Sequence, residues 1–509
     1  MKLRGLAAFF AGCTIALGQT ALCDVTAYGA KNDASAWSTK GIRDAIQACA
    51  KRGGGTVYFP PGAYETGAIE LVSNLTLQID AGATVRFHTD LAEYPVVPGR
   101  YEGTEGLTLA PLISGRNLEN VTITGRGTLT TDNAAWLRAT NNAEARAMWI
   151  SIQNRLENRG KVPEEDFRKA APSLRPSFIR PMDSKNILIE GIHIVGSSMW
   201  VIHLLYCENV VVRNVVIETY PGANTDGLDI ESSHEVRVSD SYFDTGDDAI
   251  VLKSGRGVDG RRVGRPTENV TITNCMFKHA HGAVVIGSET SGGVRNVVAS
   301  NIVSEGTEIG IRIKSGRSRG GMVENLRFDN WVIDSPLKDG ILVTNYYVKI
   351  PEEPVSERTP VFRNISISNV TVTGAPVVAD IQGLPEMPIE GLRILDLTGS
   401  GTRGVQGFNT RALALRNVKV EAEQGPAFLI RDSSDLQMDR VESARMSDSL
   451  PAIRLDRVTR VTVQGSSVSL SVAPGSLKFV TADTTVKTIE ASKDYWSGID
   501  SPDREVRRQ

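Results

Sequence analysis

Short runs in which apolar and polar residues alternate return along most of the chain, and an asparagine introduces many of them. Each run reads Asn, apolar, any residue, apolar, and such alternation predicts a β-strand with one buried face. Asn186 and Asn209 start two successive copies that lie 23 residues apart. Copies start at Asn74, Asn120, Asn186, Asn209, Asn269, Asn296, Asn325 and Asn364, with a variant at Glu235.

Repeated units of this length predict a β-solenoid. One coil cannot bury its apolar face alone, whereas stacked coils bury a continuous core and pair each strand with its copies above and below. A β-propeller would need longer blades of four strands each. The asparagines suit the turns, because Asn tolerates the left-handed backbone conformation and can bond to its copy in the next coil. The 48 glycines and the aromatic fraction of 6% fit a fold of aliphatic ladders and tight turns.

Three segments depart from the repeat. Residues 37–52 have helical spacing of apolar positions, and we expect a helix that caps the open N-terminal end of the core. Residues 131–172 are polar and helix-like around 143–159, which predicts an insertion near the binding face. Residues 501–509 are expected to form a mobile tail.

The N-terminus has the features of an export signal. Two basic residues precede the mostly apolar residues 6–17, and small side chains precede a cut ahead of Asp24. Cleavage after Gly18 is the alternative. We therefore expect a signal peptide over 1–23, one β-helix domain over 24–500, and a periplasmic or extracellular protein without a membrane span.

The five cysteines do not form a recognisable framework. Cys13 and Cys23 fall in the expected signal, which leaves Cys49, Cys207 and Cys275, odd in number and widely spaced. This spacing matches neither a zinc site nor a set of disulfides. We expect buried free thiols, with at most one bridge.

The net charge of −3 argues against nucleic acid as a partner. A polyanionic substrate would then need a local basic site, since the surface as a whole is not basic. Nothing in the pattern indicates oligomerisation, and a monomer is expected.

The strongest chemical signal is a group of aspartates in successive repeats. Asp226 and Asp248 are 22 residues apart, close to one repeat, and Asp247 is adjacent to Asp248. Equal phase in a solenoid stacks such residues roughly 5 Å apart. Crowded carboxylates tend to differ in pKa, which gives an inverting glycosidase its acid and its base. A lone Asp would more often shape a turn or bind calcium, but stacking in phase favours chemistry.

A histidine and two cations follow in the next repeats. Arg312 and Lys314 point to the same side of a strand, because side chains alternate along it. Two cations beside a group of acids suit recognition of a substrate carboxylate. Without the acids, an Arg-x-Lys pair would as often belong to a strand face that is exposed to solvent. A single histidine is more often structural, but His281 lies between the acids and the cations, which favours function.

Together these motifs resemble the polygalacturonases, glycoside hydrolase family 28, in their order and approximate spacing. Each motif is weak alone, whereas all four in order are highly specific, and the resemblance covers most of the chain. It implies a right-handed parallel β-helix, inverting hydrolysis of α-1,4-galacturonosidic bonds in pectic homogalacturonan, and no metal or other cofactor. The motifs are Asn224-Thr225-Asp226, Gly246-Asp247-Asp248, His281-Gly282 and Arg312-Ile313-Lys314.

The resemblance also implies a role for each catalytic residue. Asp247 would be the general acid, and Asp226 and Asp248 would activate the attacking water. His281 would lie near the acid and tune it, and Asn224 would help to order the pair that holds the water.

Substrate binding is implied for three further residues. Arg312 and Lys314 would hold the galacturonate carboxylate at the cleavage subsite, and Tyr346 would stack on a sugar.

Asp229 has the opposite strand parity to Asp226, and we expect it to be structural.

Local features favour an exo-acting enzyme of the bacterial branch. Residues 286–289 and 254–256 resemble that branch, and the insertion over 131–172 could close one end of the cleft. Ala280 stands where the family usually has glycine, but His281 is retained, which points to homogalacturonan.

Three alternatives remain open at this point. The first is a pectate-lyase-type enzyme, in which calcium and a basic residue would cleave by elimination. The second is a hydrolase of decorated galacturonan, either xylogalacturonan or rhamnogalacturonan. The third is a binding solenoid without activity, such as a tailspike or an adhesin.

Overall fold

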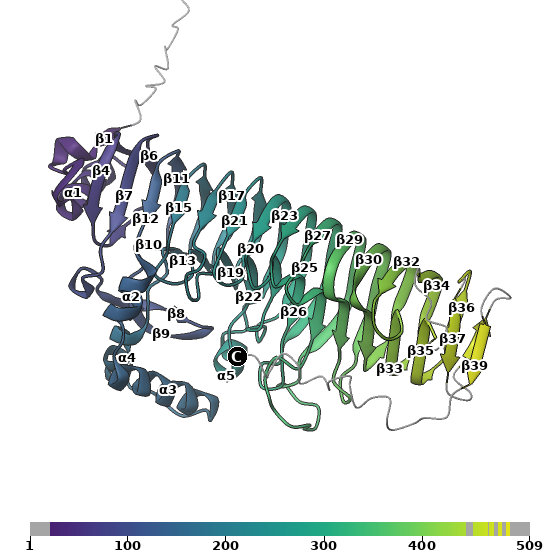
Figure 1. The fold of residues 1–509 in the computed structure, drawn as a ribbon. Helices are drawn as coiled ribbons and strands as arrows, with labels where there is room; N and C mark the ends of the chain where they lie inside the picture. Colours follow the sequence, from purple (N-terminus) through teal and green to yellow (C-terminus); the bar gives the residue numbers. More distant parts are fainter. Residues whose placement is uncertain (1–20, 444–450, 467, 473–476, 481–484, 489–509) are drawn as a thin grey trace, which may run out of the picture.

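The computed structural model describes residues 21–443, 451–466, 468–472, 477–480 and 485–488. Within them, short strands stack coil on coil along one axis (Figure 1). Equivalent strands of adjacent coils pair in parallel, for example Ile187↔Val210 and Val210↔Val236. The predicted all-β fold, a right-handed parallel β-helix, is confirmed. The predicted tail over 501–509 and most of the expected signal lie outside the described residues.

The strands form three columns, and column A carries the predicted site residues Asp226, Asp248 and Arg312 on its strands or directly before them. Its strands are short, and many are buried on both faces. Column A contains β5 (Ile69–Glu70), β10 (Ile113–Arg116), β13 (Ile179–Met182), β16 (Ile202–Leu205), β19 (Leu228–Glu231), β22 (Ile250–Lys253), β24 (Val284–Ile286), β26 (Ile309–Lys314), β28 (Asp339–Thr344), β33 (Phe428–Ser434), β35 (Ile453–Thr459), β37 (Ser469–Val472) and β39 (Thr485–Thr488).

Columns B and C complete each coil. Column B contains β1 (Leu22–Asp24), β3 (Gly55–Phe59), β6 (Leu75–Ile79), β11 (Glu119–Gly125), β14 (Lys185–Glu190), β17 (Glu208–Arg213), β20 (His234–Ser239), β36 (Val461–Gln464) and β38 (Leu477–Val480). Column C contains β2 (Asp33–Trp37), β4 (Gly62–Thr66), β7 (Ala83–Phe87), β12 (Thr128–Thr130), β15 (His193–Val195), β18 (Val216–Glu218) and β21 (Tyr242–Asp244).

Later coils use longer strands that bend from one column into the next. Those that run through columns B and C are β23 (Thr267–Lys278), β25 (Val294–Glu305), β27 (Met322–Asp334), β32 (Ala414–Ala422) and β34 (Gln437–Ser443). Two continue into column A, namely β29 (Val361–Gln382) and β30 (Ile389–Phe408), and the short β31 (Thr410–Arg411) pairs with β30 and β33.

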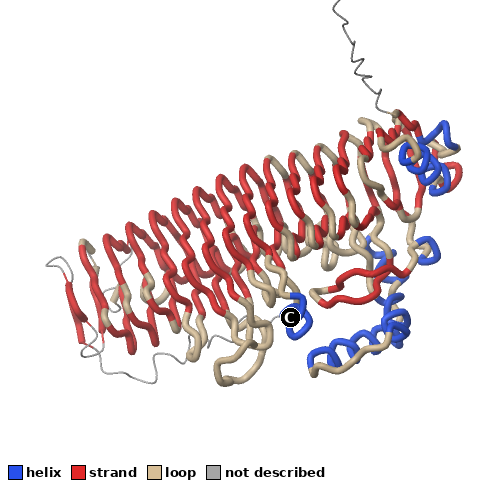
Figure 2. Tube along the Cα trace, turned by 180° about the vertical axis from the view of Figure 1, so that it is seen from behind, coloured by secondary structure: helices blue, strands red, loops and turns tan. Residues whose placement is uncertain are grey.

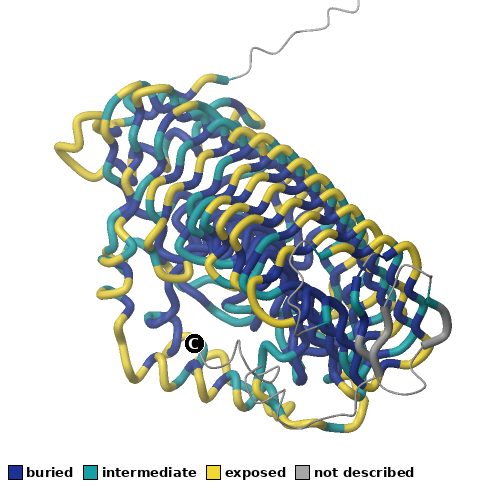
Figure 3. Tube along the Cα trace, turned by 45° about the vertical axis from the view of Figure 1, so that its right-hand side comes forward, coloured by how far each residue is buried: buried dark blue, intermediate teal, exposed yellow. Residues whose placement is uncertain are grey.

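The core fills the inside of the coils with aliphatic side chains. Along β6, Leu75, Leu77 and Ile79 point inward and are buried, while the residues between them are partly exposed. The parallel register places Leu77 between Val57 and Ile123, so each apolar position continues from coil to coil. Figure 3 shows the buried interior and the exposed turns that run along the outside.

The recurring asparagines form a ladder along one edge of column B. Asn74, Asn120, Asn186 and Asn209 have φ of 60°, 55°, 56° and 52°, the left-handed conformation that Asn tolerates. The amide Nδ2 of Asn120 donates to Oδ1 of Asn74 at 3.0 Å, and Asn186 and Asn209 continue the chain at 3.0 and 2.8 Å. This agrees with the structural role that the sequence predicts for them.

Helix α1 (Thr39–Ala50) caps the N-terminal end, as predicted for residues 37–52. The expectation of a free thiol at Cys49 is wrong, because Cys49 forms a disulfide with Cys23. Cys23 also lies in β1, where it pairs with Val57 of β3. A signal cut ahead of Asp24 would therefore remove Leu22 and Cys23 of β1, and with Cys23 one half of the disulfide. Cys207 and Cys275 are buried free thiols, as expected.

The helices gather at the capped end and on one side of the β-helix (Figure 2). They accompany an antiparallel hairpin of β8 (Val96–Tyr101) and β9 (Thr104–Leu109) that the sequence did not indicate. No helix in the described ranges has the length and apolarity needed to cross a membrane. These elements are α2 (Asn133–Ala139), α3 (Ala143–Glu157), α4 (Glu164–Ala170), α5 (Gly257–Val263), η1 (Val25–Tyr28), η2 (Leu91–Glu93) and η3 (Ala171–Ser173).

Candidate active site

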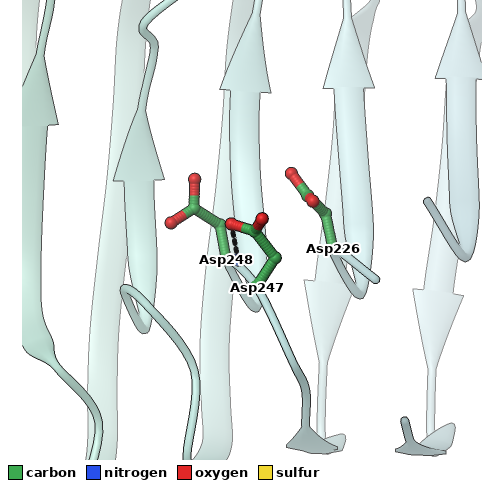
Figure 4. A group of neighbouring side chains, drawn as sticks. All are labelled: Asp226, Asp247 and Asp248. Carbon is green, nitrogen blue, oxygen red and sulfur yellow. Dashed lines mark hydrogen bonds between the residues drawn. The ribbon is translucent and has the colours of Figure 1, made fainter. Parts of the chain in front are cut away.

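Three aspartates gather at the start of two adjacent column A strands. Asp226 lies just before β19, and Asp247 and Asp248 lie in the turn that leads into β22. One carboxylate oxygen from each lies within 4.8 Å of the other two (Figure 4). The side chains of Asp226 and Asp248 are 4% and 3% exposed, while that of Asp247 is 19% exposed. The stacking expected from their phase in the repeat is thus present, and Asp247 is the most accessible of the three.

Asp247 shares a hydrogen bond with the histidine of the next coil. Its Oδ1 lies 3.0 Å from Nδ1 of His281, and its Oδ2 accepts from Asn224 at 3.5 Å. Burial alone would raise the pKa of Asp247, but the His281 contact prevails and holds that pKa well below its usual value. The same hydrogen bond raises the pKa of His281. The two groups therefore form an ion pair that holds one proton between them.

Asp226 has the opposite electrostatic character. Burial raises its pKa to about 7, and the nearby charges of Asp247 and Asp248 act in the same direction. The ammonium of Lys253 donates to Oδ2 of Asp226 at 3.0 Å and opposes the rise without cancelling it. Asp226 consequently changes charge near neutral pH, while Asp247 stays ionised.

Arg312 and Lys314 converge on the third carboxylate. Arg312 Nη1 lies 3.2 Å from Oδ1 of Asp248, and Lys314 Nζ lies 2.9 Å from its Oδ2. Both side chains leave β26 on the same side, as their alternation predicted, and both are 6% exposed. These cations offset the charge of Asp248, and a substrate carboxylate would have to share them with it.

The remaining predicted binding residues lie on either side of this group. Asn224 has φ of 54° and presents its amide to Asp247. The aromatic ring over Lys314 belongs to Tyr347, at 5.0 Å, and not to Tyr346. The ring of Tyr346 instead lies 5.7 Å from the guanidinium of Arg317. Stacking of Tyr346 on a sugar remains a prediction.

Arg175, just after the insertion and before β13, positions Asn224 and was not indicated by the sequence. Its guanidinium donates to Oδ1 of Asn224 at 2.6 Å and to the carbonyls of Ser198 and Ala223 at 2.9 and 2.7 Å. The side chain is buried, so this anchor is shielded from solvent. No sequence motif surrounds Arg175, and only the folded insertion brings it to the site.

A second set of charged residues lies buried on the outer face of β16, β19 and β22. Glu231 accepts from Arg100 of β8 at 3.2 Å and lies 2.8 Å from Nε2 of His203. Burial lowers the pKa of His203 to about 4, whereas Arg100 and His203 overcome burial and lower that of Glu231 to about 2. In sequence these charges occupy alternate strand positions that would ordinarily face water. The hairpin covers them instead.

A cation could in principle bind the three clustered carboxylates. Each of them already has a positive partner, namely Lys253 for Asp226, His281 for Asp247, and the Arg312 and Lys314 pair for Asp248. The charge that a metal would supply is therefore provided by side chains. We assign no metal to this group.

The hairpin and the insertion close the face of column A on the N-terminal side of the acids. The outward side chains of β13 and β16 there, Arg180 and His203, are 4% and 0% exposed. At the hairpin tip, the carbonyl of Gly103 accepts from the backbone N–H of Arg256 at 2.9 Å. Tyr101 of the hairpin also packs against Trp149 of α3, with ring centroids 5.6 Å apart. On the N-terminal side of Asp226, the described part of column A therefore offers no exposed surface at β13 and β16 on which a further sugar could lie.

Comparison with known proteins gives consistent matches. The model of the family described as glycosyl hydrolases family 28 matches residues 49–386. The exo-poly-alpha-D-galacturonosidase of Dickeya chrysanthemi is 26% identical over 475 residues, which cover 88% of this chain and 75% of that protein. The endo-polygalacturonase of Pectobacterium carotovorum subsp. carotovorum is 26% identical over 384 residues, which cover 74% of this chain and 88% of that protein.

A solved structure shows the same architecture. The exopolygalacturonase from Thermotoga maritima, described as hyperthermoactive, superposes with a TM-score of 0.72 and 31% sequence identity. The superposition covers 83% of this chain and 91% of that one.

Proposed function

The chain belongs to glycosyl hydrolase family 28, and from this premise we propose that it hydrolyses α-1,4-galacturonosidic bonds of pectic homogalacturonan, from a chain end and with inversion. The observation that carries the proposal is the group of Asp226, Asp247 and Asp248 beside two buried cations. Carboxyl groups that differ in proton affinity can serve as the general acid and the general base of a hydrolysis. The two cations can bind the carboxylate of a uronic acid sugar.

The proton for the leaving oxygen comes from the Asp247–His281 pair. Asp247 is the most exposed of the three acids, so it is the one that can reach a glycosidic oxygen. The proton that the pair holds moves from His281 onto Asp247 across their 3.0 Å contact and passes to that oxygen as the bond to the anomeric carbon breaks. Because the contact raises the pKa of His281, the pair keeps this proton to a higher pH than either group would alone.

Asp226 and Asp248 deal with the attacking water. Asp226 takes one proton of the water, and the remaining hydroxide bonds to the anomeric carbon on the face opposite the leaving group. Asp248, held by Arg312 and Lys314, is fixed beside it. Water activation requires ionised Asp226, so activity should rise with pH through the pKa of about 7 that burial gives this group.

Inversion has to be reconciled with the short spacing of the acids. Inverting glycosidases usually hold their two carboxyl groups about 6.5–9.5 Å apart and retaining ones about 5–5.5 Å apart. The oxygens here lie within 4.8 Å. However, Lys253 forms an ion pair with one oxygen of Asp226, and Arg312 and Lys314 contact the two oxygens of Asp248. Carboxylates held in this way are poor nucleophiles, but they can fix a water molecule by accepting its hydrogen bonds.

Exo action is supported by the closed end of the site. The outer face of β13 and β16 is buried under the hairpin of β8 and β9 and under the insertion, so a polymer can extend from the acids in one direction only. The Dickeya and Thermotoga proteins are exo-acting by name, which agrees with this geometry.

The test is a time course of purified protein on polygalacturonate with a chelator present, with the products separated by size. We expect saturated monomer or dimer from the first time points, because each cut occurs at a chain end. A ladder of saturated oligomers would contradict exo action. Unsaturated products that form only in a parallel run without the chelator would indicate a lyase, and activity only on decorated pectin would change the substrate. Asp226→Asn serves as the inactive control.

Export to the periplasm or beyond the cell is part of the proposal. The Cys23–Cys49 disulfide fits an oxidising compartment, and polymeric pectin lies outside the cell. Because Cys23 belongs to β1, we place the signal cleavage upstream of this strand, at the alternative site after Gly18. A monomer is the proposed state.

A further inference from the structure

Lys253 lies at the end of β22, deep under the hairpin, and it is not one of the residues to which the motifs assign a role. Its ammonium lies 3.0 Å from Oδ2 of Asp226 and 2.8 Å from Oδ1 of Asp229. The same nitrogen lies 3.6 Å from the centroid of the Trp200 ring. The lysine is thus fixed by two carboxylates and an aromatic face, and its side chain is 5% exposed.

Two buried carboxylates share this one ammonium. The side chain of Asp229 is fully buried, and its oxygens have no partner among the described residues other than the ion-pair contact with Lys253. A second unpaired negative charge in such a place is costly, so one of the two carboxyl groups holds a proton. Burial raises the pKa of Asp229 well above its usual value, and the charge of Asp226 adds to this.

From this geometry we infer that Lys253 is a positioning residue for the reaction, which holds the water-activating Asp226 in place and in its charged form while Asp229 remains a neutral, protonated neighbour. The inference rests on the proposed function, because it concerns the base of that reaction. It explains why a lysine lies beneath a site that already contains Arg312 and Lys314: those two serve Asp248, whereas Lys253 serves Asp226.

Other charged groups face this cluster and set the background of its titration. Asp247 and Asp248 approach Asp226 from the turn before β22 and disfavour its ionisation, while Lys253 favours it. The charged or titratable groups around Lys253 are Asp226, Asp229 and Glu231 of β19 and its approach, His203 of β16, Glu289 after β24 and Glu102 at the hairpin tip.

The sign of the effect follows from these charges. A cation within about 4–6 Å lowers the pKa of a carboxylate by about 1–3 units, so its removal moves the ionisation of Asp226 to higher pH by a similar amount. Asp226 must be charged to accept the proton of the water. Activity in a Lys253→Met variant is therefore lost mainly at low pH and partly recovered at high pH. Asp229→Asn replaces a neutral acid by a neutral amide of the same shape and leaves this ionisation where it is.

The experiment is the pH profile of kcat/KM on trigalacturonate from pH 4.5 to 9 for the wild type, Lys253→Met and Asp229→Asn. Uronate carboxyls, with a pKa near that of other carboxylic acids, are essentially ionised above about pH 5, so the substrate contributes little to the profile. We expect the acidic limb of Lys253→Met to move up by about 1–3 pH units, and that of Asp229→Asn to stay at the wild-type position. Lys253→Gln provides the same test if the methionine variant does not fold.

The outcomes separate the inference from the proposed function. An equal loss at every pH in a folded Lys253 variant would mean that the lysine is only structural, and this would overturn the inference. An upward shift in Asp229→Asn equal to that in Lys253→Met would show that Asp229 carries a charge, which overturns its neutral assignment. No hydrolysis by the wild type at any pH would instead refute the proposed function itself.

Discussion

Replacement of Asp247 by asparagine is expected to lower kcat/KM on polygalacturonate by about 10²–10⁴-fold, the range for loss of a general acid. The amide keeps the shape and the hydrogen bond to His281 but cannot give a proton to the leaving oxygen. Departure of 4-nitrophenolate needs no proton, so the loss on 4-nitrophenyl α-galacturonide should be much smaller. Comparing the two substrates under the same conditions measures this difference.

Asp226→Asn is the matched variant for this experiment. It removes the proton acceptor, which both substrates need equally, so its losses on the two substrates should be alike. The reverse pattern, with Asp226→Asn spared on the activated substrate, would contradict the assignment of the acid to Asp247. That test matters because Asp226, with its pKa of about 7, holds a proton more readily than Asp247 does.

Arg100→Met is expected to produce the largest loss of stability among substitutions near the site. The side chains of Arg100 and Glu231 are both 0% exposed, and removal of Arg100 leaves the buried Glu231 carboxylate with His203 as its side-chain hydrogen-bond partner. Breaking such a pair costs about 3–5 kcal/mol. We expect a marked fall in the thermal midpoint and faster proteolysis of the hairpin of β8 and β9, which Arg100 fastens to the β-helix.

Arg213→Met provides a matched comparison at an exposed site. Arg213 lies 2.7 Å from Glu190, but the two side chains are 49% and 26% exposed. Exposed pairs contribute about 0–1 kcal/mol, so this variant should unfold close to the wild-type temperature. Equal midpoints for the two variants would show that the buried pair does not fasten the hairpin.

The parts of the structure that the sequence predicts are those that repeat. Asn186 and Asn209 mark a turn whose geometry recurs in each coil, so their spacing indicates the fold directly. The same phase brings Asp226 and Asp248 together, because equal positions in successive coils are neighbours. A local pattern is sufficient wherever the neighbour in space is one repeat away in sequence.

The repeat pattern in the sequence does not predict the contacts between the coils and the segments that lie outside them. Arg175 reaches Asn224, and Arg100 reaches Glu231, only because the insertion and the hairpin fold back over column A. Strand parity sets Asp229 apart from Asp226, yet Lys253 contacts both carboxylates, and the strand pattern alone cannot show this. These charges look like solvent-facing strand positions until their cover is known.

The cysteines illustrate a different limit. Composition assigns Cys23 to the apolar leader, which leaves Cys49 without a partner and predicts a free thiol. In the structure, β1 places Cys23 beside the capping helix α1. Cys49 lies in the last turn of that helix and forms the disulfide with Cys23. The boundary of a leader is set by a few small residues, and that signal is too weak to override a pairing defined by the fold.

The anomeric configuration of the first product distinguishes inversion from retention, and proton NMR can follow it during rapid hydrolysis of oligogalacturonate. The proposed reaction predicts that β-galacturonate appears first from the α-linked substrate and then mutarotates, because water held by Asp226 and Asp248 attacks opposite the leaving group. Initial appearance of the α-anomer would contradict it and would mean that one of the acids, crowded within 4.8 Å, acts as a nucleophile.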